Sequence, residues 1–318
     1  MENLAPIVVF VYRRLDHVKQ VIEALKRNPE AKYSELIIFS DAGKDEKTQK
    51  EVETVRAYVK MLKGFASVQV IEREYNWGIE KSEIDGITKV VNQYGKIIVL
   101  EDDIIVGRDF LGFMNTALCE YQNEKRVSSI TGYSFISSEE CNRELPEYAF
   151  TQLTSAWVWG TWKDRWQFFE DKIYKKDFKI LLNKAVRQKF DHGFVYSDML
   201  VRQCVKGYVT WDILWYWTCF KKEMLTLFPV KTMVNNIGMD GTGVHYTDDA
   251  VQNRIEDLEV VHTNNFPKEI KEQKKVRQQI ENVLDHVVSK DSECSFISFL
   301  RSAKKALLIY YCYWKLEE

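Results

Sequence analysis

The sequence has no long apolar run and no excess of charge of either sign. No window reaches the ~18 apolar residues that a membrane-spanning helix needs. The first residues also lack the charged and apolar regions of a secretory signal. The formal net charge is −2, so no basic field favours nucleic-acid binding. These features together predict a soluble, cytoplasmic protein.

The six cysteines form no CxxC pair and show no metal-ligand spacing. This pattern predicts free thiols in a reducing compartment. The sequence also lacks internal repeats and low-complexity linkers. Its composition of 45% hydrophobic and 29% charged residues predicts a chain that buries a large core. Aromatic residues make up 13%, with nine Trp, a content compatible with ring- or sugar-binding sites as well as with a core.

The first hundred residues alternate short apolar runs with amphipathic segments. The runs have the length of buried strands and lie at 6–12, 35–43, 67–74 and 96–103. Segments with apolar residues at helical spacing separate them, at 16–28, 45–63 and 79–94. This alternation predicts an α/β fold with a mainly parallel sheet covered on both faces. In such sheets ligands bind beyond the carboxyl ends of the strands.

Polar residues gather where each predicted strand ends. They are Arg13-Arg14, Ser40-Asp41, Arg73 to Gly78, and Glu101-Asp102-Asp103. The last group places three carboxylates in "VLEDDIIV" (99–106), at the end of an apolar run. Burying an unpaired carboxylate costs roughly several kcal/mol. A positively charged partner is therefore expected at this edge of the sheet.

The second half is less regular, with a helix predicted at 108–123 and a strand at 127–136. Within "SAWVWGTWKDRW" (155–166) we predict a turn at Gly160 and helical spacing of Trp159, Trp162 and Trp166. These form either a core stripe or a wall for stacking sugars. "KGYVTWDILWYWTCF" (206–220) surrounds one carboxylate, Asp212, with Trp residues.

The C-terminal region is helical in pattern. Residues 268–288 read as a charged amphipathic helix, and residues 295–318 combine basic residues with Phe, Leu, Ile, Tyr and Trp. Two interpretations of 295–318 are equally compatible with the sequence. One is a helix in the interface of an anionic membrane. The other is a terminal helix docked on the core.

The ordered set of motifs resembles the GT-A fold glycosyltransferases that use nucleotide-sugar donors. The closest resemblance is to enzymes related to N-acetylglucosaminyltransferase I and to bacterial family-two-like transferases of surface polysaccharide assembly. The motifs span roughly residues 6–246. They are "VVFVYRRLDHVKQVIEAL", "FSDAG", "YNWG", "LEDDIIVGRDFLGFM", "WVWGTWKDRW", "TWDILW" and "NIGMDGTGVH".

The resemblance implies a role for each acidic residue of the triplet. Asp103 is the expected direct ligand of Mn²⁺ or Mg²⁺, supported by Glu101 and Asp102 through water or ribose contacts. Hard divalent cations prefer oxygen ligands and bridge phosphates, and such an ion neutralises a diphosphate leaving group. His245, at the end of the Gly-rich loop 235–246, resembles the histidine that completes the metal shell. A structural role for this histidine is equally compatible with the sequence.

The resemblance also implies donor and acceptor contacts. Asp41 is similar to the carboxylate that binds the nucleotide base, and Arg13 or Arg14 is expected beside the nucleotide. Asn76 and Gly78 resemble the loop beneath the donor, where a missing Cβ permits close approach.

Asp212 resembles the catalytic base, which removes the proton of the acceptor hydroxyl in an inverting reaction. The family often has two acidic residues in a row there, whereas Asp212 is single. Asp198 is the main rival, and a helix N-cap is the structural alternative for Asp212.

The resemblance implies a metal-dependent, inverting transferase that moves a hexosyl or N-acetylhexosaminyl group, with a UDP-sugar favoured, to a saccharide or lipid-linked acceptor. The expected organisation is a GT-A domain at 1–265, with a nucleotide half (1–106) and an acceptor half (107–265), and a helical tail at 266–318. Two alternatives stay open, a nucleotidyltransferase acting on sugar phosphates and a non-catalytic sugar- or nucleotide-binding module. The missing glycine in "FVYRRLDHV" counts against the former.

Overall fold

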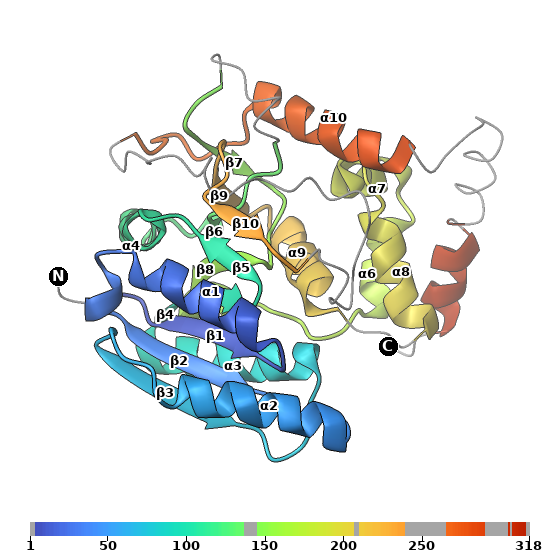
Figure 1. Cartoon of the computed structure of the whole chain (residues 1–318). Helices are drawn as coiled ribbons and strands as arrows, with labels where there is room; N and C mark the ends of the chain where they lie inside the picture. Colours follow the sequence, from blue (N-terminus) through green and yellow to red (C-terminus); the bar gives the residue numbers. More distant parts are fainter. Residues whose placement is uncertain are drawn as a thin grey trace.

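The computed structural model describes residues 4–136, 145–206, 210–238, 265–289, 305 and 307–315. An eight-stranded sheet runs through these residues in the order β3-β2-β1-β4-β8-β6-β9-β7 (Figure 1). Its strands are β1 (Ile7–Val11), β2 (Glu35–Ser40), β3 (Ser67–Glu72), β4 (Lys96–Glu101), β6 (Val127–Thr131), β7 (Tyr148–Thr151), β8 (Val158–Trp162) and β9 (Leu225–Pro229).

The sheet is mainly parallel, as the sequence predicts. β1 pairs in parallel with β2 and β4, β2 with β3, and β6 with β9. β8 lies antiparallel between β4 and β6, and β7 is antiparallel to β9. The expected α/β class is therefore confirmed, and one continuous sheet joins the first and second halves of the chain. A short antiparallel pair, β5 (Ile104–Val106) and β10 (Val234–Asn236), follows the end of β4.

The helices and one 3₁₀ turn cover the sheet and extend beyond its β7 end. They are α1 (Leu15–Lys26), η1 (Ala31–Tyr33), α2 (Glu46–Val59), α3 (Ile79–Tyr94), α4 (Phe110–Glu120), α5 (Lys163–Trp166), α6 (Lys175–Leu181), α7 (Lys184–Asp191), α8 (Tyr196–Lys206), α9 (Trp211–Lys221) and α10 (Lys274–Ser289). Residues 307–315 form a further helical segment, the C-terminal helix.

Alternation along the strands divides the core between two faces. Ile7, Val9 and Val11 of β1 belong to a cluster with residues of α1, α2 and α4. Val8 and Phe10 point to the opposite face, among residues of α3, α5 and α9. All five residues of β1 are buried, because helices cover both faces of a parallel sheet. A third cluster joins α6 to α9 with α10 and the C-terminal helix.

The Trp residues of 155–166 do not follow the predicted helical arrangement. β8 runs straight through Gly160, so Trp159 and Trp162 lie on a strand, and the predicted turn at Gly160 is wrong. A Cβ at Gly160 would come 2.8 Å from the Ile97 carbonyl oxygen of the neighbouring strand. Glycine is thus required for close strand packing here rather than for a turn.

The C-terminal helix docks on the core by one face. Ile309 and Cys312 are fully buried in the third cluster. Tyr310, Tyr311 and Trp314 are each more than half exposed. None of the described helices combines the length and the apolarity needed to cross a membrane.

Candidate functional site

The carboxyl ends of β1, β2 and β4 bring the predicted polar clusters to one edge of the sheet. These strands are parallel neighbours, and Val11, Ser40 and Glu101 are the last residues of β1, β2 and β4. The loops that follow therefore leave the sheet side by side. This edge carries the candidate site.

Asp41 organises the loop that precedes α3. Its Oδ1 accepts hydrogen bonds from the backbone N–H groups of Ala42 (2.9 Å) and Trp77 (2.8 Å). Its Oδ2 accepts from Gly78 N (2.9 Å) and Asn76 Nδ2 (3.1 Å). An ionised carboxylate offers about four acceptor sites, so the chain itself satisfies Asp41. Gly78, with φ 78°, is the N-cap of α3.

Two cations lie close to the ring of Trp77. The Arg73 guanidinium lies 4.0 Å from the ring centroid of Trp77, and Lys81 Nζ lies 4.1 Å from it. Arg73 is buried and also pairs with Asp85 at 2.6 Å. Cation–π contacts of this kind add to the backbone bonds in fixing the 76–78 loop.

Arg14 provides the positive charge that the acidic triplet requires. Arg14 Nη2 donates to Asp103 Oδ2 at 2.7 Å and also contacts Asp102 Oδ1. Although burial opposes it, the nearby Asp102 and Asp103 charges raise the pKa of the Arg14 guanidinium. Arg13 lies elsewhere, paired with Glu51 of α2 at 3.0 Å. Only Arg14 of the two joins the triplet.

Burial and repulsion between carboxylates raise the pKa values of two residues of the triplet, Glu101 and Asp102. Burial raises the pKa of Glu101, and the charges of Glu83, Asp103 and Asp102 raise it further. Burial likewise raises the pKa of Asp102, whereas Arg14 lowers it. These raised pKa values mean that full ionisation of the triplet is unfavourable with Arg14 as its partner, and a further cation would relieve that cost.

Asp103 is packed tightly by the start of the Gly-rich loop. Its backbone carbonyl accepts from Ile237 N at 2.9 Å, directly after β10. A Cβ at Gly238 would overlap Asp103 Oδ2 and lie 2.8 Å from its Cγ. Gly238 belongs to the Gly-rich loop noted in the sequence, but its contact with Asp103 was not predicted. The absence of a side chain is what permits this approach.

Asp212 lies in the first turn of α9, close to the triplet. Its charge contributes to the raised pKa of both Glu101 and Glu83, which places it within electrostatic range of both. The rival, Asp198 of α8, forms an ion pair with Lys305 at 3.1 Å. Asp212 directly follows Trp211, whose indole N–H donates to Glu83, so the packing of α9 on α3 places Asp212 on the side of the sheet that carries Glu83.

Glu83 is a further acidic residue of the site that the sequence analysis missed. It is 2% exposed, and the Trp211 Nε1–H group donates to its Oε2. Burial raises the pKa of Glu83 to about 8, with further contributions from Asp212, Glu80 and Asp103. A signal was present, because Glu83 precedes Ile87 by four residues on the apolar side of α3.

The Trp residues near Asp212 form core rather than a sugar-binding wall. Trp159, Trp166, Trp211 and Trp215 are at most 4% exposed. The ring centroids of Trp159 and Trp211 are 5.4 Å apart. These rings are covered and offer no open face for stacking a sugar.

No group of three or more His, Cys, Asp and Glu side chains arranged to hold a metal occurs among the described residues. His245 lies outside them, as does the rest of 239–264. The triplet nevertheless fits a divalent cation on one observation. Asp103 Oδ1 is buried with no hydrogen-bond partner among the described residues, although a carboxylate oxygen is a strong acceptor.

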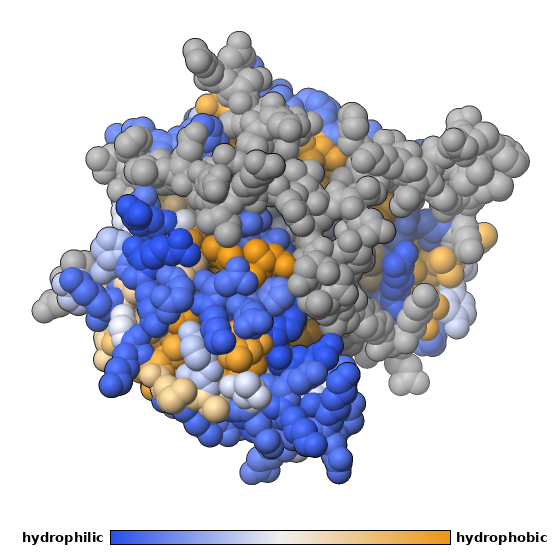
Figure 2. All heavy atoms as spheres, viewed as in Figure 1, coloured by the Kyte–Doolittle hydropathy of each residue, from blue (hydrophilic) through white to orange (hydrophobic). Residues whose placement is uncertain are grey.

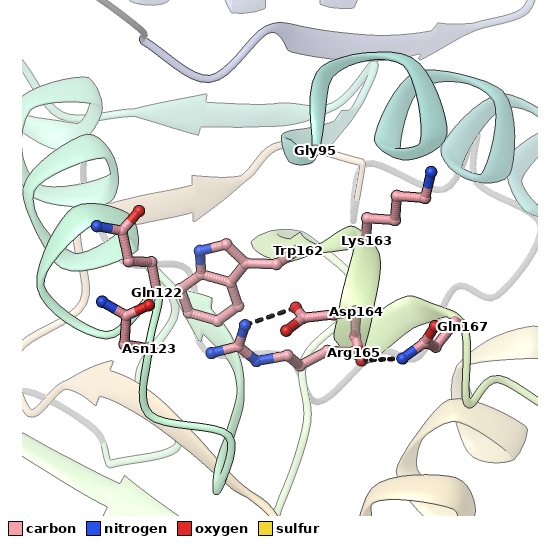
Figure 3. A pocket seen from close by; sticks show the side chains of 8 residues that line it. All are labelled: Gly95, Gln122, Asn123, Trp162, Lys163, Asp164, Arg165 and Gln167. Atoms are coloured by element: carbon pink, nitrogen blue, oxygen red, sulfur yellow. Dashed lines mark hydrogen bonds and ion pairs between the residues drawn. The ribbon is translucent and has the colours of Figure 1, made fainter.

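A separate pocket opens at the opposite edge of the sheet (Figure 3). Its volume is about 310 Å³, and it lies beside Gly95, which precedes β4, and Trp162, which ends β8. Arg165 in its wall is bound to Asp164 and to the backbone carbonyls of Val127, Tyr121 and Glu124. These contacts make Arg165 a structural residue, distant in the fold from the acidic edge.

No protein-family model and no curated protein matches the sequence. Solved structures with a related arrangement include a mannosyltransferase, PcManGT from Pyrobaculum calidifontis, in complex with GDP-Man and Mn²⁺. The identity is 9% and the TM-score 0.38, over 68% of this chain and 69% of that one. For S. aureus TarS the identity is 13% and the TM-score 0.39, over 72% of this chain and 36% of TarS. For TarS 1-349 the identity is 12% and the TM-score 0.37, over 70% of this chain and 59% of that one. At these TM-scores the likeness by itself says nothing about activity.

Proposed function

We propose that the chain is a metal-dependent, inverting glycosyltransferase that moves a sugar from a nucleotide donor, with UDP favoured, to a saccharide acceptor. One observation carries the proposal. Arg14, Glu101, Asp102 and Asp103 converge at the carboxyl end of the parallel strands, with Asp212 close by. Parallel sheets bind ligands at this edge, and a diphosphate-linked sugar needs both cations and a general base.

Each residue takes a role that its contacts support. A divalent cation held by Asp103, with Glu101 and Asp102 as support, would supply positive charge to the diphosphate leaving group. Arg14 pairs with Asp102 and Asp103, and its guanidinium would bind oxygens of the same diphosphate. His245 remains the proposed additional ligand.

Donor binding depends on the 76–78 loop in this account. We expected Asp41 to bind the nucleotide base, yet its acceptor sites are used within the chain. Asp41 then acts on the donor through the loop that it orders, with Asn76 and Gly78 beneath the sugar nucleotide. Arg13, paired with Glu51, stays a candidate for a peripheral nucleotide contact.

Asp212 is the proposed general base. It would accept the proton of the acceptor hydroxyl as that oxygen attacks the anomeric carbon and the bond to the diphosphate breaks. The hydroxyl proton ends on the carboxylate, and the electron pair of the broken bond leaves with the diphosphate. A hexosyl or N-acetylhexosaminyl donor fits this reaction.

We also propose that the acceptor is a surface polysaccharide or a lipid-linked saccharide, reached from the cytoplasmic side of an anionic membrane. Leu307, Tyr310, Tyr311 and Trp314 form the exposed face of the C-terminal helix. In the place of this helix, at the right-hand edge of the view, Figure 2 shows hydrophobic beside hydrophilic residues. Basic side chains lie beside this helix. Lys315 is over the Tyr311 ring, and Lys175 of α6 is over Tyr313. Aromatic and basic residues together suit an anionic lipid interface.

A binding survey separates this function from its alternatives. Thermal stability should be measured with UDP, GDP, UDP-sugars, GDP-sugars and nucleoside triphosphates, each with Mn²⁺. We expect a nucleoside diphosphate sugar to raise the melting temperature most, because binding to the folded state stabilises it. A shift with triphosphates alone would favour a nucleotidyltransferase. Binding without turnover would favour a non-catalytic module.

A further inference from the structure

Glu83 is a carboxyl residue buried at a position where an apolar residue would serve the packing of the core better. It lies on α3, five residues after Gly78, and faces inward with 2% exposure. The surrounding cluster is apolar and includes Ile87, Val90 and Trp211. An apolar residue there would avoid the cost of burying a carboxyl group, which is considerable without a compensating charge.

The Glu83 carboxyl group has a single described hydrogen-bond partner. Trp211 Nε1–H donates to Oε2, whereas Oε1 is buried without a partner in the part of the chain that the structure describes. Trp211 is the first residue of α9, and Asp212 is the second. The contact therefore joins α3, which begins at the donor loop, to the helix that carries the proposed base.

Packing fixes the Trp211 ring on its other sides. Its centroid lies 5.4 Å from that of Trp159 on β8 and 6.0 Å from that of Trp166 on α5. These neighbours restrict the position of the ring, and the hydrogen bond to Glu83 further restricts its orientation. Thr210, the N-cap of α9, makes no side-chain cap and is instead bonded to Gln203 of α8 through its backbone N–H and its hydroxyl. The bond from Glu83 to Trp211 restrains the first turn of α9 from the side of α3.

We propose that Glu83 is a positioning residue that holds Trp211, and through it Asp212, in register with the acidic triplet. This role rests on the proposed function. Glu83 touches no reacting atom and acts through the indole of Trp211. Its carboxyl group links the donor half of the site to the acceptor half.

Four variants test the hydrogen bond. Glu83→Leu removes the acceptor while roughly conserving volume, and Glu83→Gln keeps an acceptor oxygen without the charge. Trp211→Phe removes the donor but keeps an aromatic ring, and the fourth variant combines Glu83→Leu with Trp211→Phe. Circular dichroism melting shows whether each variant is folded.

We expect Glu83→Leu to lower the kcat of sugar transfer by about 100-fold with little change in the donor KM, since small misplacements of catalytic groups cost that much. Glu83→Gln should restore most of the kcat. The double variant should be no worse than the worse single one, because both remove the same bond. Full activity in Glu83→Leu, equal damage in Glu83→Gln, or additive losses would each overturn the role.

The contact between Glu83 and Trp211 can also be tested by NMR, without measuring sugar transfer. The Trp211 indole N–H resonance is assigned as the one missing from Trp211→Phe. It should shift and lose exchange protection in Glu83→Leu but not in Glu83→Gln. An unchanged resonance in Glu83→Leu would show that the contact is absent. Wild-type protein that turns over no nucleotide sugar would instead reject the proposed function, and Glu83's role with it.

Discussion

At the residue scale, one guanidinium is shared between two carboxylates at the end of β4. Arg14 contacts both Asp102 and Asp103, and Asp103 Oδ1 has no partner in the part of the chain that the structure describes. Arg14 thus partly neutralises a strongly acidic site without using all of its acceptor sites. Under the proposed function, a divalent cation would bind at this oxygen, and Arg14 would be free to contact the diphosphate of a bound donor.

Asp103→Asn tests the ligand role directly. The amide keeps the shape of the side chain but loses its charge, so we expect a loss of kcat of about 10²- to 10³-fold, the range for removing one preorganised charge-stabilising group. Turnover in titrations with Mn²⁺ measures it. Asp171→Asn, which changes an exposed acid, is the matched control. An unaltered metal response in Asp103→Asn would remove this residue as a ligand.

Asp212→Asn tests the base. Loss of the proton acceptor should lower kcat by about 10²- to 10⁴-fold, with donor binding unchanged. Asp198→Asn serves as the control, since that carboxylate is paired with Lys305 on another element. Initial rates and calorimetric donor binding supply the two measurements. If transfer by Asp212→Asn is near normal, another group accepts the proton.

At the scale of elements, β5 and β10 bring Ile237 and Gly238, at the described start of the Gly-rich loop, to the end of β4. Val234 pairs with Val106 and Asn236 with Ile104, which places Gly238 against Asp103. The pairing explains why the first glycine of the loop is needed, although no phosphate-binding fingerprint is present.

Gly238→Ala should therefore impair the metal site without unfolding the chain. The added methyl group must displace the Asp103 carboxylate, so we expect the Mn²⁺ concentration for half-maximal activity to rise about 10- to 100-fold, as for lost ligand orientation. Gly112→Ala on α4 is the control, because its new Cβ meets only the flexible Glu30 side chain. Equal Mn²⁺ dependence in the two variants would contradict the proposed contact.

The C-terminal helix offers a second element-scale prediction. Replacing Tyr311 and Trp314 together by Ser should reduce sedimentation with vesicles rich in anionic lipid, since these rings form its exposed apolar face. Tyr33→Ser, at another exposed tyrosine, is the control. Binding of wild-type protein should weaken with salt. Undiminished sedimentation of the double variant would exclude this face as the membrane contact.

Elements with clear end signals could be predicted from the sequence, whereas contacts between distant elements could not. Gly78 and Gly95 flank α3, and its predicted bounds, 79–94, match the structure. β8 was misread in part because both of its faces are buried, so no polar alternation marks it as a strand.

The same division holds for the site. Strand ends predicted the position of Asp41 and of the triplet, because parallel neighbours end at one edge. The Glu83–Trp211 bond joins residues 128 positions apart and depends on how α9 packs on α3. Local pattern carries no information about such packing. The sequence predicted a positive charge from Arg13 or Arg14 at this edge, but not that Arg14 would pair with Asp102 and Asp103.

At the scale of the whole molecule, a single sheet carries the acidic triplet at the end of β4 and supports α9, the helix with Asp212. The parallel strands β1, β2 and β4 gather the charges, and β8 connects them to the second half (Figure 1). Function is then expected to require both halves and a divalent cation together.

Turnover of nucleotide sugars with and without metal tests this account most directly. Donor hydrolysis, and transfer to saccharide acceptors, should be measured for UDP- and GDP-sugars with Mn²⁺, with Mg²⁺ and with EDTA. We predict that one donor class is turned over, that EDTA abolishes this activity, and that added Mn²⁺ or Mg²⁺ restores it. Turnover that continues unchanged in EDTA would contradict the metal role of the acidic triplet, and the absence of turnover with every donor would contradict the proposed transferase.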